Sequence, residues 1–297
     1  MKTHDALWEY IKKSERRAII DDVFYARMSS DIAKKFDSGC YDIRIAEHKK
    51  CINELNNLHI KYPANAKPVF YLYIVPDDNF VELLRYPYKY RKGGGRPVDC
   101  YDMDGFSAAY GSSQNLLNSD RPVSMEQHVN NIHEYAHLIQ HQFGSDAQMF
   151  GEGFAELVPW YVMEYDKINP IHVAAMRSMN KVYTANELLS SVKFSDKVPN
   201  MTCSFQPSYM SSYLWVRAVV EHIHSKFKLS RVDATQKFLE LYRNVKFSGH
   251  LLAEGLAKEI GMDADKLLNS TEYQMDVLKQ IETEAVVTNI RTRGNEK

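Results

Sequence analysis

The sequence has no apolar run of the roughly 18 residues that a membrane-spanning helix requires. Its N-terminal stretch, Met1 to Arg17, is charged and amphipathic, and it lacks the apolar core and the cleavage site of a secretory signal. Internal repeats and low-complexity tracts are also missing. We therefore expect a protein without a membrane span that is cytoplasmic as the sequence stands, with a secreted or translocated form left open.

An excess of charge of either sign is missing as well. The 297 residues include 37 Lys and Arg against 38 Asp and Glu, so the net charge is close to zero. Proteins that bind nucleic acid or an anionic membrane usually carry a strongly basic surface, and this balance predicts neither partner. With 44% hydrophobic and 25% charged residues, the composition is that of a soluble globular protein with one large domain or two smaller ones.

Cysteine is scarce, and the four residues form no CxxC pair: Cys40, Cys51, Cys100 and Cys203. We therefore expect no structural zinc knuckle. Scattered thiols in a chain of this length are usually small buried side chains. Without a sign of an oxidising compartment, we expect them to stay free of disulfides.

The beginning of the chain is expected to be helical. Apolar residues recur at near-helical spacing between residues 4 and 60, first around Leu7 and Ile11 and again around Ile43 and Ile52. The pattern changes after Pro63 and Pro68, which interrupt regular structure.

The middle of the chain predicts a small mixed sheet. β-branched and aromatic residues from Val69 to Val75 predict a strand, and Phe106 to Gly111 predict another, at the edge of the sheet. Ser124 and Gln127 then resemble a capping box at the start of a helix. Further helices are expected at 153–165, 209–228, 232–244, 250–260 and 264–280, after the first at 124–144. The order predicts an α+β fold in three parts: a helical segment 1–62, a subdomain 63–167 and a mostly helical subdomain 168–297.

The residues that carry chemistry lie in the run His133-Glu134-Tyr135-Ala136-His137. On a helix, two histidines four residues apart lie on one face and can bind the same zinc ion. Glu134 projects beside the metal, where it can hold the bound water and accept its proton. The spacing therefore supplies two ligands, His133 and His137, and a general base, Glu134, from one stretch of helix.

A catalytic zinc ion usually has three protein ligands, so one is missing from this run. His141 lies further around the same helix and cannot easily complete a compact site. Glu152 and Glu156 lie four residues apart on the next expected helix, so one can bind the metal while the other holds a ligand histidine by its far ring nitrogen. Gly151 and Gly153 flank Glu152 and are expected to let this helix pack closely against the first.

The run His133 to His137, followed by Glu152-Gly153-Phe154-Ala155-Glu156, resembles the gluzincin clan of zinc metallopeptidases. The tripeptide His133-Glu134-Tyr135 and the glycine-rich stretch Gly93 to Gly95 also resemble those of collagenase-type peptidase domains. The resemblance covers residues 68–280. It implies a zincin-like catalytic subdomain with a Zn²⁺ cofactor, Glu152 as the third ligand, and Glu156 as the residue that orients a zinc-bound histidine.

The same resemblance implies a Tyr or His from the helical subdomain that stabilises the oxyanion of the reaction. Tyr209 is the first candidate and Tyr213 the second, although in a chain with 19 tyrosines a helical Tyr is more often part of the core. His222 and His224 fall in an amphipathic helix and are expected at the surface. The strand from Phe106 to Gly111 is expected to bind an extended peptide by strand addition.

The leading hypothesis is a zinc-dependent endopeptidase that acts on protein or peptide substrates. An aminopeptidase-like hydrolase of small peptides and a catalytically silent zincin-fold binding protein are the alternatives. The spacer 138–151 is shorter than in the aminopeptidase branch of the clan, and no strand near 105–112 resembles its exopeptidase motif. An intact Glu134 argues against a silent protein. The sequence predicts neither a cleavage preference nor an oligomeric state.

Overall fold

The computed structural model describes residues 13–63, 69–75, 100–103, 106–112, 124–143, 148–165, 181–190, 207–244 and 249–294, together with positions 173, 174, 176 and 179. The chain divides into two compact units, the first of residues 1–59 and 64–139, the second of residues 60–63 and 140–297. Helices and a sheet occur together, which confirms the α+β class. The division differs from the expected three parts, because the N-terminal segment joins the sheet in one unit and the boundary lies near residue 139.

The first unit is built on a mixed sheet. Its described strands are β1 (Glu15–Ile20), β2 (Phe24–Met28), β3 (Phe70–Val75), β4 (Cys100–Met103) and β5 (Phe106–Ser112). They lie in the order β1-β2-β3-β5-β4. The three inner strands are parallel, and each outer strand is antiparallel to its neighbour. The predicted strands at 69–75 and 106–111 are confirmed.

The N-terminal part of the helical prediction is wrong, because residues 15–28 form an antiparallel hairpin. Asp22 lies at its turn with φ +59°, and its backbone N–H donates to the hydroxyl of Tyr25 at 2.9 Å. Apolar runs as short as Ile19-Ile20 fit a strand as well as a helix, and β-branched residues favour the strand. The helical prediction is confirmed further on, in α2 (Ser30–Asp37) and α3 (Asp42–Asn56). Its first part, around Leu7 and Ile11, lies outside the described residues.

The prediction that Phe106 to Gly111 form an edge strand is also wrong. Ala108 of β5 pairs with Tyr71 of β3 on one side and with Tyr101 of β4 on the other. Strand β5 therefore has a partner strand on each side and is an inner strand of the sheet rather than an edge. An Asp-Gly pair at 104–105 separates β4 from β5 in the sequence, and this dipeptide is a strong hairpin signal that the prediction did not use.

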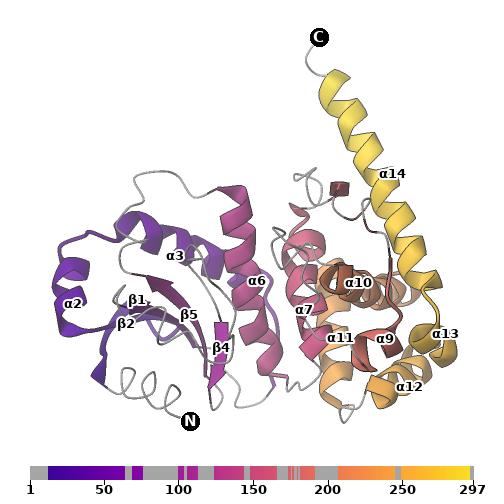
Figure 1. The fold of residues 1–297 in the computed structure, drawn as a ribbon, viewed down its shortest axis with the longest axis horizontal. Helices are drawn as coiled ribbons and strands as arrows, with labels where there is room; N and C mark the ends of the chain where they lie inside the picture. The colour runs from indigo at the N-terminus through magenta and orange to yellow at the C-terminus, as the bar shows by residue number, and fades with distance from the viewer. Residues whose placement is uncertain are drawn as a thin grey trace. The chain divides into compact units, whose positions relative to one another are not determined.

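Helices α3 and α6 (Met125–His141) cover one face of this sheet (Figure 1). Phe24 of β2 and Phe70 of β3 are register partners, and the ring of Tyr135 meets both edge-on at 6.0 and 5.6 Å. The Tyr135 hydroxyl also lies 2.9 Å from Nδ1 of His48 on α3. All four side chains are buried, so Tyr135 fixes α6 to both the sheet and α3.

The second unit is helical and surrounds α10 (Pro207–Phe227), in which every residue from Met210 to Val220 is buried. The other described elements of this unit are α7 (Gln148–Leu157), a π-helical turn η1 (Val158–Val162), α9 (Ala185–Ser190), α11 (Arg231–Asn244), α12 (Gly249–Ile260), α13 (Ala264–Asn269) and α14 (Glu272–Gly294). Helices α7, α11 and α14 pack directly on α10 (Figure 1).

Most of the expected helices of this unit are confirmed. The one expected at 264–280 is divided into α13 and α14 by Ser270, which has extended backbone angles and whose hydroxyl accepts a hydrogen bond from the Glu272 amide at 3.1 Å. The helix expected from Gly153 begins earlier, at Gln148. No helix in the described part of the chain combines the length and the apolar character needed to cross a membrane.

Candidate metal centre

Helix α6 begins at a side-chain cap. The Ser124 hydroxyl accepts a hydrogen bond from the Gln127 amide at 3.2 Å, which satisfies one of the free donors of the first turn. The Gln127 side chain does not complete a capping box, because its amide donates to Asn131 at 3.0 Å. Further along, buried Ile132 and Ile139 continue the face that packs on the unit's core. The helix therefore holds the predicted site residues on a backbone that is fixed at its start.

The two histidines of the predicted motif face each other. The rings of His133 and His137 are 5.0 Å apart between centroids and nearly perpendicular, at 87°. His133 is buried and His137 is half-buried. This is the arrangement expected of two residues four apart on a helix, and it lets one nitrogen of each ring approach a common ion.

The neighbours of these histidines in the sequence divide between the site and the core. Glu134 is half-buried, whereas Tyr135 points into the core towards His48. Burial lowers the pKa of His48 to about 4, so this imidazole is neutral near pH 7 and shares a neutral hydrogen bond with the tyrosine. Tyr135 anchors α6 through its core face, which leaves the His133 and His137 face for binding.

Helix α7 carries the predicted glutamates. Glu152 is half-buried and Glu156 is almost fully buried. One carboxylate oxygen of Glu156, Oε2, accepts a hydrogen bond of 2.8 Å from the indole nitrogen of Trp160. Glu156 is thus held in a fixed orientation within its own helix, as a residue that positions another side chain must be.

The chain widens into the π-helical turn η1 directly after these glutamates. Pro159 has no N–H to donate, and its ring crowds the carbonyl four residues earlier. The backbone instead makes one wider helical turn. In it, the Met163 amide donates to the Val158 carbonyl, five residues earlier, at 3.0 Å. Single π-turns inside helices often lie beside functional sites, and this turn places Trp160 against Glu156.

The two glycines that flank Glu152 contact different elements. A Cβ atom at Gly153 would lie 2.5 Å from both the carbonyl oxygen and the hydroxyl of Ser212, so this glycine allows α7 to approach α10. A Cβ atom at Gly151 would lie 3.3 Å from Oε1 of Gln140. The expectation that both glycines serve packing against the first helix is therefore correct only for Gly151, which faces the last turn of α6.

The candidates for an oxyanion donor differ in what surrounds them. Tyr213 is fully buried, and its hydroxyl accepts a hydrogen bond of 2.8 Å from Nη1 of Arg217, which makes it a core residue. Tyr209 is half-buried. His222 and His224 are half-buried rather than exposed, and they bond to the carbonyl oxygens of Ile260 and Leu229. The His141 side chain lies outside the described part of the structure.

The cysteine prediction is confirmed for Cys51, which is buried and free of a disulfide. Cys40 is also a free thiol but is exposed, and the side chains of Cys100 and Cys203 lie outside the described residues.

Sequence reasoning missed a second group of donors in the first unit. Glu47, Cys51 and His128 lie close enough together to hold a metal ion. The signal in the sequence was faint: Glu47, Cys51 and Glu54 share one face of α3 by their spacing, but His128 lies on α6 and is far away along the chain.

Comparison with family models, curated proteins and solved structures finds no match for this chain. The assignment of function therefore rests on the residues themselves.

Proposed function

We propose that this protein is a zinc-dependent peptidase that acts as an endopeptidase on protein or peptide substrates. The observation that carries the proposal is the pair of facing imidazoles of His133 and His137, with Glu134 between them on the same helix. Two histidines with a carboxylate in this position supply ligands and a base for metal-assisted hydrolysis.

Glu152 completes the ligand set. We assign Glu152 as the third ligand from its place in the sequence after the histidine pair, since two imidazoles with one carboxylate are a common ligand set of hydrolytic zinc. Packing inside the second unit supports this assignment, because Gly151 faces Gln140, which follows His137 on the same helix. Glu156, fixed by Trp160, orients a ligand histidine through its far ring nitrogen.

A zinc ion held by His133, His137 and Glu152 would supply Lewis-acid chemistry for the scissile carbonyl and for a water molecule. Glu134 would accept the proton of that water and later deliver it to the nitrogen of the leaving amine. Tyr209 donates a hydrogen bond to the carbonyl oxygen as it gains negative charge. Tyr213 is excluded from this task because its hydroxyl is buried against Arg217.

The arrangement of elements supports a zincin-like fold for the catalytic part. A mixed sheet carries α6 on one face, and a helical unit follows in the chain. In such a fold the active-site helix lies under the sheet and the third ligand comes from the next helix, which here is α7.

The experiment that tests the proposal is digestion of an unbiased peptide library, read by mass spectrometry. The zinc-loaded protein should cleave internal bonds, and it should cleave N-blocked and free-amine peptides of equal sequence at similar rates. Removing the metal with a chelator should abolish cleavage, and adding zinc should restore it. Cleavage confined to free-amine peptides would show an aminopeptidase rather than an endopeptidase. No cleavage in any zinc-loaded sample would contradict the proposal.

The ligand assignment is tested separately by zinc affinity. Glu152→Ala should weaken zinc binding at this centre, whereas Glu240→Ala, which changes an exposed glutamate on α11, should leave it unchanged. An unchanged zinc affinity in Glu152→Ala would remove Glu152 from the ligand set.

A further inference from the structure

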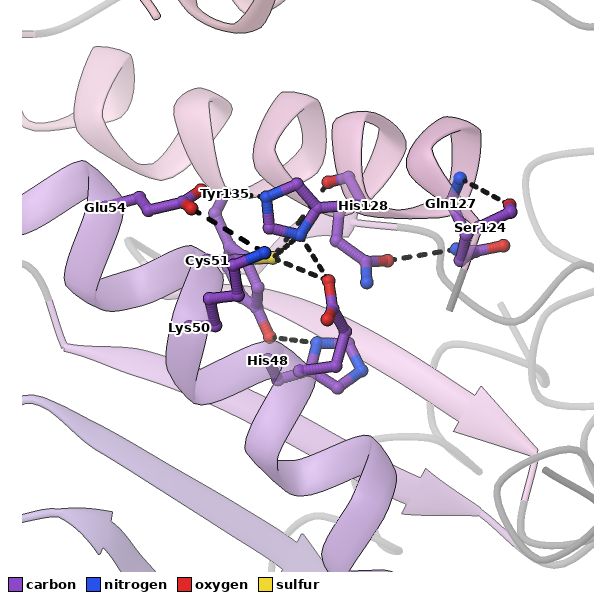
Figure 2. A network of polar contacts seen from close by, with 10 residues as sticks. His48, Lys50, Cys51, Glu54, Ser124, Gln127, His128 and Tyr135 are labelled. Atoms are coloured by element: carbon purple, nitrogen blue, oxygen red, sulfur yellow. Dashed lines mark hydrogen bonds and ion pairs between the residues drawn. The ribbon is translucent and has the colours of Figure 1, made fainter. Parts of the chain in front are cut away.

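A cluster of polar side chains joins α3 to the first turns of α6 (Figure 2). Glu47, Cys51 and Glu54 project from one face of α3, because residues four and seven apart lie on the same side of a helix. His128 projects from α6 between them.

Two of the three distances within this cluster are those of ligands around one ion. Sγ of Cys51 lies 3.4 Å from Nδ1 of His128 and 3.7 Å from Oε1 of Glu47. Oε1 of Glu47 also contacts Nδ1 of His128. Zinc bonds of about 2.0–2.3 Å in a tetrahedron place neighbouring ligand atoms roughly 3.3–3.8 Å apart. The two sulfur distances already match, and the contact between Glu47 and His128 has only to open for an ion to enter.

Glu54 holds the opposite side of the same imidazole. Its Oε2 atom lies 2.8 Å from Nε2 of His128. With a metal ion bound at Nδ1, on the side of Glu47 and Cys51, Nε2 would keep its proton and donate it to Glu54. A carboxylate that fixes the tautomer of a ligand histidine is the usual outer partner in metal sites.

Burial and charge favour a cation at this place. Cys51 is fully buried and His128 is 4% exposed, while two carboxylates flank the ring. A divalent ion bound there would balance the negative charges of Glu47 and of a Cys51 thiolate.

We propose that Glu47, Cys51 and His128 bind a divalent transition-metal ion, with Glu54 orienting His128. Thiolate and imidazole ligands select zinc over magnesium or calcium. Three protein ligands leave one position for water. The ion links α3 to the start of α6, the helix that carries the histidine pair, and its binding does not depend on the proposed peptidase activity.

Cobalt titration of the metal-free full-length protein tests this site selectively. A cobalt–thiolate bond gives a charge-transfer band in the near ultraviolet, and the proposed catalytic ligands His133, His137 and Glu152 include no thiolate. The band should reach its full height with one equivalent bound at this site in the wild-type protein and in Cys40→Ser, which changes the exposed cysteine. It should be absent in Cys51→Ser.

A wild-type protein without the band would overturn the proposal, whatever the folding of the variants. A band that persists in folded Cys51→Ser would also overturn it. Glu54→Gln should keep the band but weaken cobalt affinity about 10–100-fold, the usual cost of losing an outer carboxylate. An unchanged affinity in that variant would remove Glu54 from the site.

Discussion

The indole nitrogen of Trp160 donates a hydrogen bond of 2.8 Å to Oε2 of Glu156, four residues earlier in the chain. Glu156 is 1% exposed, so this bond offsets part of the cost of burying a carboxylate and helps to orient it. The π-turn that follows α7 determines where Trp160 lies. In the proposed centre, the orientation of a zinc-bound histidine therefore depends on the backbone around Pro159.

Replacing Trp160 by Phe should lower zinc affinity about tenfold, because the carboxylate that orients the ligand loses its anchor. Affinity is measured by competition with a chelator in a Cys51→Ser background, so that only the proposed catalytic centre is titrated. Glu156→Gln is the matched variant, since its amide oxygen still accepts from Trp160 but its charge is gone. Equal affinity in wild type, Trp160→Phe and Glu156→Gln would show that Glu156 does not act on the metal.

Gly153→Ala should destabilise the second unit by about 1–3 kcal/mol, because the new methyl group would overlap Ser212 of α10. Gly151→Ala is the control. Its Cβ atom meets only the flexible end of Gln140 at 3.3 Å, and the gain in helix propensity offsets that crowding, so its effect should stay within about 1 kcal/mol. Urea unfolding of both variants measures the difference. A Gly153→Ala protein as stable as Gly151→Ala would contradict the close approach of α7 to α10.

Tyr209→Phe should lower kcat about 10²-fold with little change in KM, because the lost hydrogen bond forms only as the carbonyl oxygen gains charge. Tyr213→Phe should instead leave kcat unchanged and reduce stability by about 1–3 kcal/mol, since Arg217 loses a buried partner. Steady-state kinetics and thermal unfolding separate the two. A fall in kcat for Tyr213→Phe at unchanged stability would contradict this assignment and make Tyr213 the hydrogen-bond donor in catalysis.

Long periodic segments could be predicted from the sequence. The strand at 70–75 and helix α6 have the expected type and place, because a short run rich in aromatic and β-branched residues favours a strand and a sustained 3.6-residue spacing favours a helix. The facing of His133 and His137 followed from their spacing alone. The hairpin at 15–28 was missed because its apolar runs are too short to distinguish the two periods.

Contacts between distant parts of the chain could not be predicted. The pairing of β5 with β3 joins segments that are far apart in the sequence, and no local pattern specifies it. Gly153 has no room for a side chain because Ser212 of another helix lies against it. The cluster around His128 needs α3 and α6 side by side, and nothing in a linear pattern states that they pack. The spacing of residues in the sequence predicts which side chains share a face of one helix. A complete site also needs side chains from other elements, and only the packing of the fold brings these together.

The measurement that tests the central claim most directly compares zinc content and peptide hydrolysis in Glu134→Gln. Glu134 is proposed as the base and not as a ligand, so the variant should keep its zinc. Hydrolysis should fall by about 10²–10⁴-fold, the usual contribution of a general base. Glu240→Gln serves as the control for a surface glutamate and should keep both properties. A zinc-loaded Glu134→Gln protein that cleaves every substrate at the wild-type rate would contradict the proposed mechanism.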